Sequence, residues 1–80
     1  MSAVNAYVLV QTEVGRSAAV AQAIAEIPGV TTAEDVTGPY DVIVRVEADD
    51  MDTLGRDVIG PLQHIGGITR TLTCPVVRLA

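Results

Sequence analysis

The 80-residue sequence contains no tryptophan, no phenylalanine and no lysine, and it has a single cysteine and a single histidine. With Tyr7 and Tyr40 as the only aromatic residues, a hydrophobic core must be built from valine, isoleucine, leucine and alanine. Cys74 cannot form an internal disulfide, and we expect it to be a small buried residue of a strand. One cysteine and one histidine are too few for a zinc site, so the sequence predicts neither a metal site nor a cofactor.

Positive charge is scarce. All five basic residues are arginines, and ten acidic residues give the chain a net charge of −5. Proteins that bind phosphate backbones or anionic lipid surfaces use clusters of basic residues, and this sequence has none. The amino terminus lacks the basic flank and apolar core of a signal peptide, and no apolar run approaches the roughly 18 residues of a membrane span. We expect a cytoplasmic protein that contacts neither nucleic acid directly nor a membrane.

The length corresponds to one small domain, residues 1–80. Such a domain buries only roughly 60–65% of the surface of its unfolded chain. A hydrophobic content of 49% is high for this size, and a surplus of aliphatic side chains is typical of a subunit interface. We therefore expect an obligate oligomer.

Hydrophobic periodicity divides the chain into two halves that each run strand, helix, strand. Strands are expected at 4–11, 30–36, 42–46 and 68–79, and helices at 17–27 and 50–65. Ser17 is available as the N-cap of the first helix, and Pro28-Gly29 ends it. Pro61 cannot donate a backbone hydrogen bond, so we expect the second helix to be kinked or broken there. Pro75 places the last strand at a sheet edge or at a bulge.

Two such halves joined by a turn predict an α+β, ferredoxin-like βαββαβ domain, a four-stranded antiparallel sheet with two helices on one face. The segment Ile27-Pro28-Gly29-Val30 recurs as Ile65-Gly66-Gly67-Ile68, which supports the repeat. The first strand is a continuous apolar run and is expected to be covered on both faces. The strands offer apolar side chains to both faces of the sheet, with Val42, Val44 and Val46 opposite Ile43, and Val8 and Val10 opposite Tyr7 and Leu9. Because the helices cover only one face, we expect the chain to dimerise, sheet to sheet or edge to edge, into an α/β sandwich.

Catalytic groups are also scarce. The only histidine, His64, is near the end of the second helix, where helix-end contacts explain it better than general-base catalysis. Asp49, Asp50 and Asp52 gather where that helix begins, so capping and dipole compensation explain them better than calcium binding. The sequence predicts a binding module and not an enzyme.

The densest group of polar and conformationally special residues is the central turn, residues 36–41, with the sequence Val-Thr-Gly-Pro-Tyr-Asp. Gly38 and Pro39 make a rigid corner with exposed backbone groups, and Tyr40 and Asp41 add an aromatic ring and an anionic acceptor. This combination suits the binding of a small polar molecule. A hairpin turn without any ligand is the simpler interpretation.

Thr69, Thr71 and Thr73 share one face of the last strand by its two-residue period and form a row of hydroxyls, with Arg70 between them. Turn amides and threonines can donate to the carboxylate of an amino acid, while Asp41 can accept from its ammonium group. We therefore expect an amino acid as the ligand. The alternative is a solvent-exposed strand face, because threonine favours strands in any case.

The turn 36–41, the strand after it and residues 67–73 (Gly-Ile-Thr-Arg-Thr-Leu-Thr) together resemble the effector-binding, or RAM, domain of the Lrp/AsnC regulators. The resemblance extends from Ala6 to about Val77. It implies the βαββαβ fold, dimers that assemble into rings, commonly octamers of four dimers, and an amino-acid effector bound between neighbouring dimers. By position, the resemblance implies that the effector loop is made of Thr37, Gly38, Pro39, Tyr40 and Asp41. It also implies that Thr69, Thr71 and Thr73 on the last strand form part of the neighbouring wall of the site.

Full-length members of that family carry an amino-terminal helix-turn-helix, whereas here the first expected strand begins almost at Met1. The DNA-binding role therefore does not carry over, and the chain resembles a stand-alone RAM protein. Its expected action is to sense an amino acid and to co-assemble with full-length Lrp/AsnC relatives.

Three other interpretations share the topology. A small dimeric α/β-barrel enzyme of the monooxygenase-like or haem-handling type would need a polar cleft around His64. An ACT-like regulatory domain would bind its ligand near residues 12–16, where only Glu13 is a suitable polar group. A purely structural oligomerisation module would use Pro39 and its turn only for packing against a neighbour.

Overall fold

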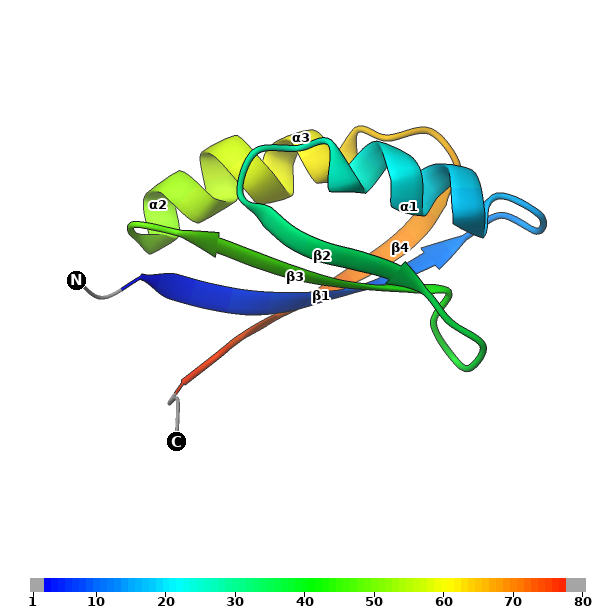
Figure 1. Ribbon diagram of the computed structural model, residues 1–80, viewed down its shortest axis with the longest axis horizontal. Coiled ribbons are helices and arrows are strands. Elements are labelled where there is room, and N and C mark those ends of the chain that lie inside the picture. Colours follow the sequence, from blue (N-terminus) through cyan, green and yellow to red (C-terminus); the bar gives the residue numbers. More distant parts are fainter. Residues whose placement is uncertain (1–2, 78–80) are drawn as a thin grey trace.

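A four-stranded antiparallel sheet in the order β2-β3-β1-β4 carries the helices on one face (Figure 1). The computed structural model describes residues 3–77. The elements in chain order are β1 (Val4–Thr12), α1 (Ser17–Ala25), β2 (Val30–Asp35), β3 (Val42–Ala48), α2 (Met51–Thr53), the π-helical segment η1 (Leu54–Ile59), α3 (Gly60–Gln63) and β4 (Ile68–Pro75). This is the predicted ferredoxin-like arrangement, in which α2, η1 and α3 follow one another as the second helix.

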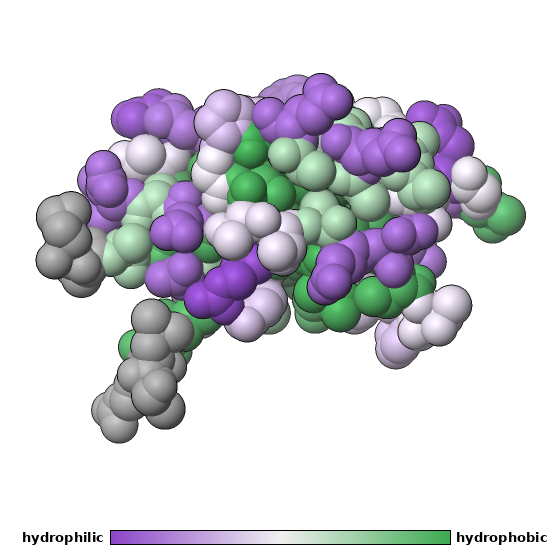
Figure 2. Space-filling view, in the orientation of Figure 1, coloured by the Kyte–Doolittle hydropathy of each residue, from purple (hydrophilic) through white to green (hydrophobic). Residues whose placement is uncertain are grey.

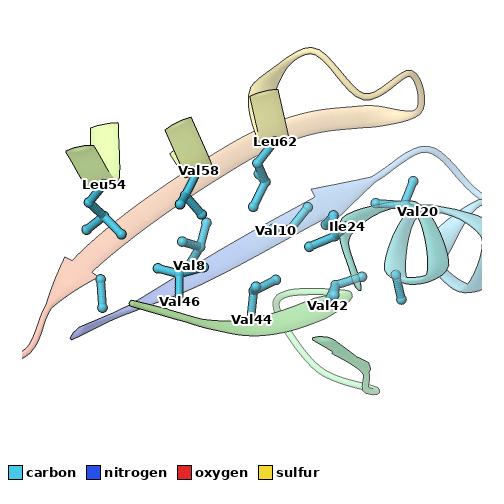
Figure 3. Packing of buried hydrophobic residues seen from close by; sticks show 12 residues of the cluster. Val8, Val10, Val20, Ile24, Val42, Val44, Val46, Leu54, Val58 and Leu62 are labelled. Atoms are coloured by element: carbon cyan, nitrogen blue, oxygen red, sulfur yellow. The ribbon is translucent and has the colours of Figure 1, made fainter. Parts of the chain in front are cut away.

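The core lies between the sheet and the helices (Figure 3). Alternate residues of the two central strands point toward the helices and are fully buried, namely Ala6, Val8, Val10, Val42, Val44 and Val46. The helices cover them with the buried side chains of Val20, Ala21, Ile24, Leu54, Val58 and Leu62. The periods of strand and helix place these two sets of aliphatic side chains on facing surfaces.

The opposite face of the sheet is not covered by any helix of residues 3–77. Tyr7 is 41% exposed and Leu72 is 38% exposed, while Leu9 and Ile43 are half-buried. The expectation that the first strand is covered on both faces is therefore not met within one chain. Figure 2 shows hydrophilic side chains along the upper, helix side, and hydrophilic and apolar side chains side by side over the strands below.

The second helix changes its hydrogen bonding along its length. η1 ends with a bond from the N–H of Gly60 to the carbonyl of Gly55, the wider spacing of a π-helix. Pro61 follows directly and, having no N–H, cannot continue the regular α-helical ladder. The predicted irregularity of this helix is confirmed, as a widened turn and not as a complete break.

The first helix begins differently from the prediction. Ser17 is its first residue, and Arg16 is the N-cap, without a side-chain cap hydrogen bond. The N–H of Arg16 bonds to the carbonyl of Glu13 at 3.0 Å, and this turn sets where the helix starts. The expectation that Ser17 is available as the N-cap is therefore wrong.

The acidic cluster at the start of the second helix provides a cap. The carboxylate of Asp50 accepts a hydrogen bond of 2.7 Å from the N–H of Thr53. This bond favours the charged form and lowers the pKa of Asp50, with a smaller contribution from Arg56. The capping interpretation is confirmed for Asp50. Within residues 3–77, no group of three His, Cys, Asp or Glu side chains could hold a metal ion.

Each helix leads into its following strand through a glycine with positive φ, Gly29 at 99° and Gly67 at 97°. The carbonyl of Gly29 accepts a bond from the N–H of Glu47, and that of Gly67 accepts one from Glu13, each at 2.8 Å. The internal repeat in the sequence therefore corresponds to two equivalent turns. A Cβ added to Gly29 would lie 2.6 Å from Cγ2 of Val58, so the first turn also needs the missing side chain.

β4 lies at an edge of the sheet, as Pro75 predicts. The observed strand and helix ends differ from the expected ones by a few residues, because turns and caps decide the ends more than the apolar pattern does. The part of the last strand expected at 78–79 lies outside the described residues. None of the helices in residues 3–77 is long and apolar enough to cross a membrane.

Candidate functional site

The central turn, residues 36–41, joins β2 to β3 and projects from one end of the sheet (Figure 1). A bond of 2.8 Å from the N–H of Val36 to the carbonyl of Asp41 closes it. Gly38 has a φ of 155°, with open space where a side chain would be. Thr37, Gly38 and Pro39 are exposed and Tyr40 is half-buried, so the turn presents its backbone to solvent.

The carboxylate of Asp41 is tied to the end of β1. Its Oδ2 atom accepts a hydrogen bond of 2.8 Å from the N–H of Thr12 and one of 3.3 Å from the hydroxyl of the same residue. The pairing of β1 with β4 shifts register between Gln11 and Thr12. The N–H of Thr12 therefore lies where the strand pairing is irregular, and the Asp41 carboxylate is its hydrogen-bond acceptor. The second oxygen, Oδ1, takes part in neither bond and is the one that can face a ligand.

A second tie holds the turn from its other side. The side-chain amide of Gln11 donates a bond of 3.0 Å to the carbonyl of Pro39, and the N–H of Asp41 donates one of 2.8 Å to the carbonyl of Val10. Two residues near the end of the turn are therefore fixed to β1. The turn is preorganised by the neighbouring strand, which lowers the entropy lost when a ligand binds.

The threonine row is on β4, at the margin of the helix-covered face. Thr71 pairs with Val10 and Thr73 pairs with Val8, both of which point toward the helices. Thr71 is half-buried and its hydroxyl accepts a bond of 3.3 Å from the side-chain amide of Gln63. Thr71 and Thr73 therefore do not belong to the uncovered face, although Thr73 is exposed. Thr69 is also exposed and lies at the register shift, where it has no pairing partner on β1.

The row also offers backbone groups. The N–H of Val76 donates to the carbonyl of Asn5 at 2.8 Å, and in an antiparallel ladder bonded pairs alternate with non-bonded pairs. Val76 is a bonded residue, so every second position counted back from Pro75 is a non-bonded one. These positions are Pro75, Thr73 and Thr71, and their backbone groups point away from β1. Pro75 therefore removes no bond from the ladder, and the threonines present both hydroxyl and backbone groups at the free edge.

A shallow, open depression of about 240 Å³ adjoins this edge and is lined by Gln63, Ile68, Thr69, Arg70 and Thr71. Its lining, among the described residues, combines an amide, a guanidinium, hydroxyls and strand backbone and includes no carboxylate. Such a set can hold a neutral polar group or an anion, because it supplies hydrogen-bond donors without negative charge.

The two groups of predicted site residues lie in different parts of the chain. The turn 36–41 follows β2 at one edge of the sheet, and Thr69, Thr71 and Thr73 lie on β4 at the other edge, with β3 and β1 between these strands. The end of the turn is nevertheless tied to Val10 and Gln11 of β1, whose partners on β4 are Thr71 and Arg70. Among residues 3–77, no hydrogen bond joins the turn directly to the three threonines.

Three residues with roles in these elements were missed by sequence reasoning: Gln11, Thr12 and Gln63. Gln11 and Thr12 are the first polar residues after the apolar run of β1, and the fold places that strand end beside the hairpin turn. This signal was available in the sequence. The position of Gln63 against Thr71 depends on the helix geometry near Pro61 and had no comparable signal.

The remaining chemically notable residues have simple surroundings. His64 is the C-cap of α3, and its Nδ1 lies 2.8 Å from the carbonyl oxygen of Gly60, which is the predicted helix-end contact. The expectation of a buried Cys74 is wrong, because it is exposed on the edge strand β4, paired with Tyr7.

A comparison with protein-family models identifies the family of this chain. Residues 5–79 match the family model described as the Lrp/AsnC ligand binding domain. A curated relative, the HTH-type transcriptional regulator PH1916 of Pyrococcus horikoshii, which is described as uncharacterized, is 41% identical over 54 residues. The matched part is 68% of this chain and 36% of that protein, so the chain matches only about a third of its length.

Two solved structures extend the comparison. TTHA0845 from Thermus thermophilus is 34% identical, with a TM-score of 0.88 and coverage of 96% of each chain. Transcriptional regulator NMB0573 from Neisseria meningitidis, solved as an L-Met complex, has a TM-score of 0.77 at 19% identity. That match covers 94% of this chain and 50% of the regulator, and at this identity it shows a shared fold alone.

Proposed function

Because the chain belongs to the Lrp/AsnC ligand-binding domain family, we propose that it is a regulatory module whose small-molecule effector is an amino acid. The family binds small effectors such as amino acids, and a regulator of the same fold was solved with L-Met. The family is regulatory and typically non-enzymatic. In this role residues 1–80 act as one domain, and they work in the cytoplasm.

The observation that carries the proposal is a pair of complementary groups, the turn 36–41 and the β4 edge, which flank the end of β1 without a direct hydrogen bond between them. The turn 36–41 is an anchored loop with an available carboxylate oxygen on Asp41. The β4 edge supplies the hydroxyls of Thr69, Thr71 and Thr73 and the backbone groups of Thr71 and Thr73, beside an open depression. We infer that the effector lies between the turn of one copy and the β4 edge of another.

The chemistry of the two parts fits the two ends of an amino acid. Oδ1 of Asp41 accepts from the ammonium group, and the exposed backbone of Thr37, Gly38 and Pro39 together with the β4 hydroxyls serves the carboxylate. Tyr40, half-buried beside Asp41, contributes its ring to contact with the effector side chain.

A site shared between copies requires assembly. We propose dimers that close into a ring of four dimers, an octamer, in which each effector site joins neighbouring dimers. We propose that this domain reaches transcription by co-assembly with full-length Lrp/AsnC regulators, without direct contact between residues 1–80 and nucleic acid.

The test is a thermal-shift screen of the purified protein against the twenty amino acids, with the oligomer mass measured by light scattering in each. A ligand at a hundredfold excess over its Kd stabilises the folded state by about 2.7 kcal/mol, a readily measured shift in Tm. One or a few amino acids are expected to raise the Tm of the wild type but not that of Asp41→Asn. Asp35→Asn, an exposed change on β2, is the matched control.

A purely structural module is the second candidate, and one observation favours it. Oδ2 of Asp41 and the carbonyl of Pro39 are already engaged by β1, as they would be in a turn that serves only packing. A stable ring whose Tm does not respond to any of the twenty amino acids would support this function and exclude the effector proposal.

A further inference from the structure

The uncovered face of the sheet is mostly apolar at its centre. Tyr7 and Leu9 of β1 point to this face, since their neighbours Ala6, Val8 and Val10 are buried against the helices. The register places Ile43 beside Leu9 on one side and Leu72 beside Leu9 on the other. Tyr7 and Leu72 are both more than a third exposed, so this patch lacks a cover within residues 3–77.

One charged side chain lies within the patch. Arg45 pairs with Tyr7 across β1 and β3, and its guanidinium carbon is 5.0 Å from the centre of the Tyr7 ring. Its Nη1 donates a bond of 2.6 Å to the hydroxyl of Tyr7, and its Nη2 donates one of 3.4 Å to Oδ1 of Asn5. Stacking and hydrogen bonding together hold Arg45 in one pose.

Among the described residues, Arg45 has neutral partners only. Within residues 3–77, the single ion pair joins Arg56 to Asp57, on the helix side of the molecule. A guanidinium that is desolvated beside apolar side chains needs an anionic acceptor, because leaving it unpaired is unfavourable. Whatever covers this face must therefore bring a carboxylate to Arg45.

The same face carries two exposed carboxylates at its sides. Glu47 is two residues from Arg45 along β3 and thus points to the same side. Glu34 of β2 pairs with Ile43 and also shares this side. Arg70 of β4, which is exposed and pairs with Gln11, lies on this face as well. The face therefore combines an apolar centre, one cation held in place, a second exposed cation and two exposed anions, a pattern that is complementary to itself.

We propose that Arg45 is the residue through which this face recognises a second copy of the same chain. In a two-fold dimer each contact occurs twice, so Arg45 of each copy pairs with Glu34 or Glu47 of the other around the apolar centre. The second copy is favoured over a different protein because the face itself carries the carboxylates that Arg45 needs. This inference rests on the self-association part of the proposed function and is independent of the effector.

The test is charge reversal followed by compensation, with dimer dissociation measured by analytical ultracentrifugation. Arg45→Glu is expected to raise the dissociation constant of the dimer at least about thirtyfold, because two carboxylates then meet in place of an ion pair. Adding Glu34→Arg or Glu47→Arg to the same chain is expected to restore the dimer. Arg56→Glu, the same change of charge on the helix side, is the matched control and should leave the dimer unchanged.

Arg45 also holds Tyr7, so Arg45→Glu could disturb the sheet itself. The single variants Glu34→Arg and Glu47→Arg avoid this difficulty, because both side chains are exposed. A mixture of Arg45→Glu with the glutamate variant that dimerises more weakly is then expected to form mixed dimers, although neither chain dimerises well alone. A dimer that persists in Arg45→Glu, or one that neither glutamate reversal restores, overturns the inference while leaving self-association intact. A wild-type chain that is monomeric at all concentrations overturns both.

Discussion

The carboxylate of Asp41 accepts hydrogen bonds from the N–H and the hydroxyl of Thr12, and so fastens the turn after β2 to the end of β1. One oxygen holds the structure, and the other is available to a ligand. The structural role and the proposed binding role of this residue therefore overlap, and a simple truncation of Asp41 cannot separate them.

Two substitutions of Asp41 distinguish the roles. Asp41→Ala leaves the N–H of Thr12 without its acceptor and is expected to lower the free energy of unfolding by about 1–2 kcal/mol, measured by urea denaturation. Asp41→Asn retains a carbonyl oxygen for Thr12 and should lose less than half as much stability. It also removes the negative charge, so it is expected to abolish the amino-acid-induced rise in Tm.

Thr12→Val provides the matched control for these variants. It removes only the longer of the two bonds, at 3.3 Å, and keeps the backbone N–H in place. Its stability should therefore lie close to that of the wild type, with effector binding retained. An Asp41→Asn protein that still responds to the effector like the wild type would contradict a charge-based role for Asp41.

The fold was predictable from the sequence, because aliphatic side chains recur with strand and helix periods and glycine marks both helix-to-strand turns. Gly29 and Gly67 have nearly the same φ and accept equivalent bonds, as the repeat suggested. The site was less predictable. Nothing local to residues 36–41 reveals that Gln11 and Thr12 hold the turn, since these contacts join segments far apart in the chain.

The end of the first helix offers a direct test of packing. Gly29→Ala would place a Cβ 2.6 Å from Val58 Cγ2 on a backbone with a φ of 99°. Overpacking and left-handed strain together are expected to lower the free energy of unfolding by about 2–4 kcal/mol. Gly66→Ala is the control, because open space surrounds that position and its φ is not positive. Equal Tm values for the two variants would show that the turn adapts.

The cap of the second helix predicts a dependence of stability on pH. The bond from Thr53 lowers the pKa of Asp50 in the folded state, so the carboxylate contributes stability above its ordinary, unfolded pKa of about 3.8. That contribution is lost as the pH falls through the lowered folded pKa. Asn also caps helices well but does not titrate. Asp50→Asn should therefore lose less Tm than the wild type when the pH is lowered from about 5 to 2. Asp52→Asn is the control. It leaves the Thr53 bond intact, so its Tm should fall with pH as steeply as that of the wild type.

An effector site shared between copies predicts complementation between two defective chains. Asp41→Asn impairs the turn but keeps the β4 edge, whereas Thr71→Val impairs the edge but keeps the turn. Each variant alone is expected to bind no effector. In oligomers reassembled from an equal mixture, about a quarter of the sites combine the turn of one variant with the edge of the other and are intact. Isothermal titration calorimetry should therefore recover about a quarter of the wild-type stoichiometry at the wild-type affinity. If the turn and the edge served one ligand within a single chain, every site would carry one defect and mixing would restore nothing.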